Sequence, residues 1–252
     1  MKIIHLSDLH FHRNNKDNKK AIATLKKVKS AYPDHYLVVT GDIVDDGHEK
    51  QFENAYKELK HFEGRIFIAP GNHDFGAVGS FYSRTSARLF DEMLSGPLNQ
   101  GGTFFGDNVP VVNVIREGSD IVMFIALDTN LETQHPFDFA SGKVGGSQIE
   151  ALSTILSNPT VPGMKKILFF HHHPFIHNDP FMELQDAEKL ARVVYNNVDV
   201  ILFGHKHVMA KWEDNRWGTK CILASDNSPG KEYAGEITII NGEIKKPDYV
   251  KI

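Results

Sequence analysis

The chain has 252 residues, of which 41% are hydrophobic and 24% are charged, the composition of an ordinary soluble globular protein. Its 28 basic and 32 acidic residues give a net charge of −4, so overall charge offers no attraction for nucleic acid or an anionic membrane. The single cysteine, Cys221, excludes an internal disulfide, and we expect a cytoplasmic protein because the sequence shows neither a secretory signal nor a membrane-spanning apolar run.

The N-terminal part of the chain alternates between strand and helix patterns. Short apolar or β-branched runs at 2–6, 35–40 and 65–70 predict buried strands. Between them, apolar residues at helical spacing predict helices over 17–32 and 50–62. This strand–helix–strand–helix–strand order is typical of a parallel sheet with helices packed on its faces.

The remaining chain continues as a mixture of helices and strands. The patterns predict helices over 83–94, 147–156 and 186–196, and strands at 104–106, 111–115, 120–128, 165–171 and 198–204. Ser147 and Glu150 have the spacing of a capping box at the start of the helix over 147–156. Turn-forming residues separate several further strands between 208 and 250. Because no linker or repeat is visible, we expect one domain over residues 1–252.

Polar side chains follow five of the predicted strands. They are Asp8 and His10, Asp42, Asn72 and His73, the three histidines 171–173, and His205 and His207. In open α/β sheets, sites form beyond the carboxyl ends of the strands, so we expect these side chains to converge. Within the pairs Asp8/His10 and His205/His207, residues two apart face the same side of an extended segment.

The donor set of this cluster suits a pair of divalent metal ions. Carboxylates, an amide and imidazoles, without a thiolate, favour Mn, Fe, Zn or Co. One tetrahedral ion cannot use so many ligands, whereas two ions about 3.5–4 Å apart would use them all through a bridging carboxylate. Such a site attracts an anion and acidifies a water molecule, as hydrolysis of a phosphate ester requires. Asp-x-His alone is common, Gly-Asp after a strand is usually a turn, and Gly-Asn-His-Asp is rarer, so the prediction depends on the joint occurrence of the motifs.

Five short motifs then match a known family in order. They are "DLH" (8–10), "GDIVDDG" (41–47), "GNHD" (71–74), "HHHP" (171–174) and "GHKH" (204–207). On these motifs the chain resembles the calcineurin-like metallophosphoesterases, and among them most the small bacterial phosphodiesterases of the class III cyclic-nucleotide type. The resemblance implies an α/β fold, a four-layer α/β/β/α sandwich with two mixed β-sheets flanked by helices, and a dinuclear metal site.

The resemblance also implies which residues would bind metal. One ion would be held by Asp8, His10 and His207, a second by Asn72, His172 and His205, and both by the bridging Asp42. His172 is selected because the family's ligand lies two positions before the proline. His171 is then interpreted as the end of a buried strand that packs in the core. His173 is interpreted as a residue that supports a metal ligand or forms part of the wall of the substrate-binding pocket.

His73 is predicted to act on the substrate without binding metal. Together with Asn72 it would bind the scissile phosphate, and it would stabilise the phosphate's charge or protonate the leaving oxygen. The family pattern G-D-x-x-D gives Asp45 as the carboxylate that orients His73, while Asp74 would brace the loop. In the implied mechanism a metal-bound hydroxide attacks phosphorus directly, without a covalent enzyme intermediate.

Departures from related families narrow the predicted substrate. Asp46 and Asp74 stand where serine/threonine protein phosphatases carry arginine and glutamate, and His73 stands where lipid A-pathway pyrophosphatases carry arginine. The leading hypothesis is therefore a phosphodiesterase acting on a small phosphodiester, nucleotides included. The alternatives are a phosphomonoesterase with the same metals, a nuclease and a non-catalytic metal-binding scaffold.

Three further segments bear on partners. The lysine-rich stretch 16–29 is interpreted as a solvated helix face, so nucleic acid is not expected as a partner. Aromatic residues in the loops 75–84 and 135–142 could stack on a base or simply pack against the loops, and both interpretations stay open. Nothing in the sequence indicates an oligomeric state.

Overall fold

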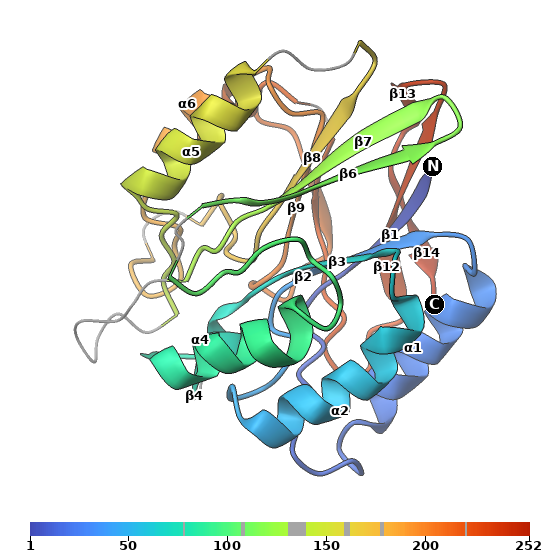
Figure 1. Cartoon of the computed structure of the whole chain (residues 1–252), viewed down its shortest axis with the longest axis vertical. Helices are drawn as coiled ribbons and strands as arrows, with labels where there is room; N and C mark the ends of the chain where they lie inside the picture. The colour runs from blue at the N-terminus through green and yellow to red at the C-terminus, as the bar shows by residue number, and fades with distance from the viewer. Residues whose placement is uncertain (78, 107–108, 131–139, 159–161, 177–178, 220) are drawn as a thin grey trace.

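Two sheets of six strands pack face to face in the computed structural model, which describes residues 1–77, 79–106, 109–130, 140–158, 162–176, 179–219 and 221–252 (Figure 1). The first sheet has the order β13–β12–β1–β2–β3, with β14 also paired to β12. Its strands β1 (Lys2–Leu6), β2 (Tyr36–Thr40) and β3 (Ile66–Ala69) are parallel, as predicted. Antiparallel pairing adds β12 (Tyr233–Ile240), β13 (Glu243–Ile244) and β14 (Asp248–Lys251).

The second sheet has the order β10–β11–β9–β8–β7–β6. Its parallel strands are β7 (Asp120–Ala126), β8 (Lys165–Phe169), β9 (Val200–Phe203) and β11 (Cys221–Ala224). The two edge strands, β6 (Val111–Glu117) and β10 (Ala210–Trp212), pair antiparallel. A separate ribbon joins β4 (Gly76–Ala77) to β5 (Phe81–Tyr82). Both large sheets are therefore mixed.

Helices cover the outer faces of the two sheets (Figure 1). The first sheet is covered by α1 (Lys19–Ala31) and α2 (Glu49–Leu59), and α4 (Arg84–Phe90) packs beside α2. The second sheet is covered by α5 (Gly146–Ser157) and α6 (Ala187–Val194). The short elements are α3 (Asn72–Phe75), the 3₁₀ turns η1 (Lys60–Phe62) and η3 (Asn215–Trp217), and the π-helical turn η2 (Asp91–Ser95). The predicted four-layer sandwich is confirmed.

Side chains alternate between the two faces of each central strand. Along β8, Ile167 and Phe169 join the core between the sheets, whereas Leu168 joins the cluster under α5 and α6. Across the core, Phe67 of β3 stacks on Phe124 of β7 with ring centroids 4.0 Å apart. Strands buried on both faces need apolar residues at nearly every position, which explains the continuous apolar runs in the sequence.

Three local predictions differ from the structure. Residues 104–106 form no strand, because the Asp91 carboxylate accepts the N–H groups of Phe104 and Phe105 and bends the chain there. The helix predicted over 83–94 divides into α4 and η2. Ser147 does not cap α5, since the helix begins one residue earlier at Gly146. Among the described residues, no helix is long and apolar enough to cross a membrane.

Candidate metal centre

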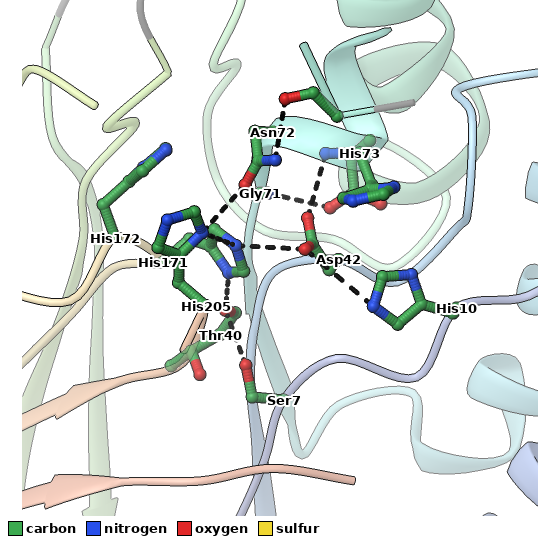
Figure 2. A network of polar contacts seen from close by, with 12 residues as sticks. Ser7, His10, Thr40, Asp42, Gly71, Asn72, His73, His171, His172 and His205 are labelled. Carbon is green, nitrogen blue, oxygen red and sulfur yellow. Dashed lines mark hydrogen bonds and ion pairs between the residues drawn. The ribbon is translucent and has the colours of Figure 1, made fainter. Parts of the chain in front are cut away.

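The polar residues singled out in the sequence gather beyond the carboxyl ends of strands from both sheets (Figure 2). Asp8 and His10 follow β1, Asp42 follows β2, and Asn72 and His73 follow β3. In the other sheet, His171 follows β8, and His205 and His207 follow β9. The first three strands belong to one sheet and the last two to the other. The cluster therefore lies where the ends of the two sheets meet.

Five of these residues adopt a backbone conformation that is rare for residues other than glycine. Their φ angles are positive, at 60° for Asp8, 48° for His10, 49° for Asp42, 76° for His205 and 52° for His207. A left-handed residue costs about 1–2 kcal/mol and persists where the surroundings impose it. The Asp8 N–H donates to the Gly41 carbonyl over 3.1 Å, and the His10 N–H donates to that of Asp42 over 3.0 Å. Extended segments were predicted to bring together the side chains within the pairs Asp8/His10 and His205/His207. The structure instead brings them together through bent backbone.

Asp42 stands at the centre of the cluster. Its Oδ1 accepts the His73 backbone N–H at 3.0 Å. Its Oδ2 lies 3.2 Å from His171 Nε2 on one side and 4.0 Å from His10 Nε2 on the other. The side chain is only 2% exposed. One carboxylate oxygen is therefore held between two imidazole nitrogens, the position that a ligand shared by two cations would take.

Three ligand atoms lie on the His171 side of Asp42. His205 Nδ1 is 3.1 Å from Asn72 Oδ1 and 3.2 Å from His171 Nε2. Ligand atoms about 2.1 Å from a common cation are separated by about 3.0–3.4 Å, so these distances match a coordination shell. The Asn72 Nδ2 donates to the Gly79 carbonyl at 2.9 Å, which turns Oδ1 toward His205.

The triple histidine is the point at which the structure departs from the predicted ligand set. His171 Nδ1 lies 2.7 Å from the Thr40 carbonyl, and its Nε2 faces Asp42, so His171 is not a simple packing residue. In Figure 2 the His172 ring lies farther from Asp42 than the His205 ring, whose centroid is 4.6 Å from that of His172, and His172 Nδ1 lies 2.8 Å from the Thr129 hydroxyl. The physical reason is the alternation of β8. Phe169 faces the space between the sheets and Phe170 faces outward, so His171 faces inward again.

On the other side of Asp42, a second group of ligand atoms surrounds Asp8. Atoms of Asp8, His10 and His207 lie within 4.8 Å of one another. Asp8 is fully buried, and neither of its carboxylate oxygens has a hydrogen-bond partner among the described residues. A buried carboxylate without a partner is strongly unfavourable, so a cation is the group that fits this place. The residues present therefore suit a metal ion on each side of Asp42.

The electrostatics of the cluster point the same way. Burial lowers the pKa of His171, but the Asp42 and Asp8 carboxylates outweigh burial and raise it to about 9. Burial likewise lowers the pKa of His10, yet its contact with Asp45 and the charges of Asp42 and Asp8 raise it to about 9. In the absence of metal, protons on these two imidazoles supply the positive charge that the carboxylates require.

His73 is oriented by the backbone of Asp45 and not by its carboxylate, which corrects the predicted role. His73 Nδ1 lies 2.7 Å from the Asp45 main-chain carbonyl, to which it donates its proton. The Asp45 carboxylate instead faces His10 Nδ1 at 3.5 Å and His12 Nδ1 at 3.3 Å. The predicted bracing role of Asp74 is confirmed, because its carboxylate accepts the Val44 and Gly71 N–H groups, each at 2.8 Å.

His173 lies in an aromatic environment, and its predicted part in the substrate-binding pocket stays a prediction. It is fully buried, and its ring packs edge-on against Phe203 and Trp212, with centroids 4.7 and 4.9 Å away. In the loop 75–84, Phe75 is buried against Phe90, whereas Phe81 is 56% exposed. Most of the other aromatic loop, 135–142, lies outside the described residues.

The sequence analysis missed one supporting residue, Asp226. It is buried after β11, and its Oδ1 lies 3.4 Å from His207 Nδ1. This contact, followed by burial and the charge of Asp8, shifts the pKa of His207 upward overall. A carboxylate on the second ring nitrogen orients a metal-binding histidine and increases its basicity. A signal was available, because Asp226 follows an apolar run, "CILA", as the other site residues do.

Comparison with known proteins finds a matching family model and several relatives. The family model described as calcineurin-like phosphoesterase matches residues 1–209. A probable cyclic nucleotide phosphodiesterase of Coxiella burnetii is 24% identical over 217 residues, covering 82% of this chain and 76% of that protein. A probable glycerophosphodiester phosphodiesterase of Arcobacter nitrofigilis is 24% identical over 248 residues, covering 93% of this chain and 80% of that protein.

Solved structures share the fold at low sequence identity. The purple acid phosphatase from yellow lupin superimposes with a TM-score of 0.60 at 14% identity. The match covers 100% of this chain and 51% of the lupin protein, so the chain spans about half the length of that structure.

The departure at the triple histidine generates a direct prediction. Substituting His171→Gln removes a nitrogen from the group around Asp42, so we expect the purified protein to retain one Mn²⁺ per chain where the wild type retains two. His172→Gln is the matched control and should retain both ions. Metal analysis by mass spectrometry after gel filtration measures this, and loss of an ion from the His172 variant alone would reverse the assignment.

The raised pKa values of His10 and His171 predict that metal affinity depends on pH. Both imidazoles must be neutral to bind a cation, so each proton displaced below pH 9 opposes binding. Apparent Mn²⁺ affinity should rise by about tenfold to a hundredfold per pH unit between pH 6.5 and 8.5, for one or two protons displaced. Titration against a chromogenic chelator measures it, and an affinity that does not change with pH would refute the prediction.

Proposed function

The chain belongs to the calcineurin-like phosphoesterase family, and we propose that it is a phosphodiesterase that hydrolyses a small phosphodiester with two divalent metal ions. The observation that carries the proposal is the position of Asp42 Oδ2 between His171 Nε2 and His10 Nε2. A shared carboxylate between two nitrogen ligands is the central element of a two-metal site.

The proposed ligand sets follow from the two groups of atoms. One ion would be held by Asp8, His10 and His207, the other by Asn72, His171 and His205, with Asp42 bridging them. The donor atoms are imidazole nitrogens and carboxylate or amide oxygens, a set that suits Mn, Fe, Zn or Co. His171 here replaces His172, which the sequence alone had favoured.

The metal ions, when bound, would supply an acidified water as the nucleophile and offset negative charge on the phosphoryl oxygens. The residues of the chain position the other parts of the reaction. The donated hydrogen bond to the Asp45 carbonyl fixes the His73 ring, so Nε2 is the atom left to donate a proton to the leaving oxygen. His73 also packs edge-on against His10 at 4.8 Å, which places it beside the proposed metal ligands.

Two observations favour a small phosphodiester as the substrate. The two relatives reported above are both named as phosphodiesterases, one for cyclic nucleotides and one for a glycerophosphodiester. Asp46, at the position where protein phosphatases carry an arginine, is an acid paired with Arg13 over 2.7 Å. Because Asp46 and Arg13 neutralise each other, this position offers no free positive charge to bind the second negative charge of a phosphomonoester. A phosphomonoesterase with the same metals is the second candidate.

A pair of chromogenic esters tests the proposed reaction. After reconstitution with Mn²⁺, the wild type should hydrolyse bis-p-nitrophenyl phosphate with a higher kcat/KM than p-nitrophenyl phosphate. Asp42→Asn should lower kcat/KM for the diester by about a thousandfold, because metal ions contribute several kcal/mol to the transition state. A preference for the monoester would establish the second candidate, and hydrolysis of neither ester by metal-loaded protein would overturn the proposal.

The hydrogen bond from His73 Nδ1 to the Asp45 main-chain carbonyl leads to a separate prediction about the Asp45 side chain. Removing the proton donor with His73→Gln should lower kcat by about 10²–10⁴-fold. Asp45→Asn keeps the main-chain carbonyl, so at saturating Mn²⁺ its kcat should fall much less. The Asp45 carboxylate contacts His10, so its substitution should instead weaken Mn²⁺ binding. Equal losses of kcat in the two variants at saturating metal would show that the carboxylate orients His73 after all.

A further inference from the structure

A lysine lies between two of the proposed metal ligands. His205 and His207 both have positive φ angles, of 76° and 52°, and the Lys206 N–H donates to the Gly204 carbonyl at 3.0 Å. This tight turn directs the Lys206 side chain to the surface while His205 is buried. No carboxylate among the described residues forms an ion pair with the Lys206 ammonium group, so its charge is available to a ligand.

Lys206, the residue between the proposed ligands His205 and His207, lines a cavity. The cavity has a volume of about 460 Å³ and is lined by Phe175, Ile176, Asp179, Met182 and Lys206. This volume lies within the range of about 300–1,000 Å³ for small-molecule sites. Phe175 follows the triple histidine and stacks on Trp212 with centroids 5.1 Å apart, which fixes the apolar wall. Two short segments, 171–175 and 205–207, thus carry both proposed metal ligands and residues of the cavity wall.

We propose that this cavity binds one arm of the phosphodiester and that Lys206 binds a second anionic group, a phosphate or a carboxylate, on that arm. The inference rests on the proposed function, because it assigns the substrate class of the same site. Phe175, Ile176 and Met182 supply apolar contacts for the body of the arm.

Charge balance explains why Lys206 would bind a second anion and not the scissile phosphate. Two divalent cations, when bound, would bring +4, the carboxylates of Asp8 and Asp42 would return −2, and the deprotonated water that acts as nucleophile would return −1. The remaining +1 is balanced by the single negative charge of a phosphodiester, so Lys206 is not needed for the scissile phosphate. Among the described residues that line the cavity, Asp179 is the one acid, and its Oδ1 accepts the Phe181 N–H at 3.2 Å. The negative charge of Asp179 opposes the binding of an anion in the same cavity. Removing this charge should therefore strengthen anion binding, whereas removing the charge of Lys206 should weaken it.

Two esters that differ by one phosphate test the proposal. They are thymidine 5′-(p-nitrophenyl phosphate) and the same compound with a 3′-phosphate. The ratio of their kcat/KM values should favour the 3′-phosphorylated ester in the wild type, and Lys206→Met should lower that ratio about fivefold, as loss of one partly exposed charge contact implies. Lys206→Arg should keep the preference, and Asp179→Asn should increase it. Lys57→Met, on the outer helix α2, is the matched control and should leave the ratio unchanged.

Product binding separates this inference from the proposed function. Calorimetry with Mn²⁺-loaded protein compares thymidine 3′,5′-bisphosphate with thymidine 5′-monophosphate and needs no turnover. We expect the wild type to bind the bisphosphate more tightly than the monophosphate. Lys206→Met should remove this preference, and added KCl should weaken it. That result would support anion binding in the cavity even if neither ester is hydrolysed. Equal affinities in the wild type, an unchanged ratio in Lys206→Met, or an equal change in Lys57→Met would overturn it.

Discussion

The structure depends on one constraint, the burial of the Asp42 carboxylate between imidazoles delivered by two different sheets. His10 comes from the turn after β1 and His171 from the end of β8, and both approach the same oxygen. Neither sheet alone could surround that oxygen. The face-to-face packing, with Phe67 stacked on Phe124, therefore serves the site as well as the core, because it fixes the separation of the strand ends.

Without bound cations, two features of the cluster oppose folding. Left-handed backbone at Asp8, Asp42 and His205 costs about 1–2 kcal/mol at each position, and the Asp8 oxygens are buried without partners. A cation that binds only the folded chain offsets such costs by mass action. Strained backbone and unpartnered charge thus occur together in this protein at the residues that the proposed chemistry requires, which is the usual place for stored strain.

The sequence predicted the layers of the fold and the segments of the site, but not every atom. Asp8, Asp42 and Asn72 could be found because polar residues after buried strands converge wherever parallel strands end. Local patterns favoured His172, whereas His171 faces Asp42 in the structure, as counting inward from Phe169 along β8 indicates. Asp226 was missed because its approach to His207 depends on β11 lying beside β9, a pairing that no local pattern encodes.

The role of Asp45 shows a second limit. A motif identifies the loop but does not distinguish a main-chain carbonyl from the side chain of the same residue, and here the carbonyl orients His73. The central claim, two cations sharing Asp42, is tested most directly by anomalous diffraction from crystals grown with Mn²⁺. The account predicts two anomalous peaks about 3.5–4 Å apart on either side of Asp42 Oδ2, one near His10 and one near His171. A single peak, or two peaks that do not share Asp42, would contradict it.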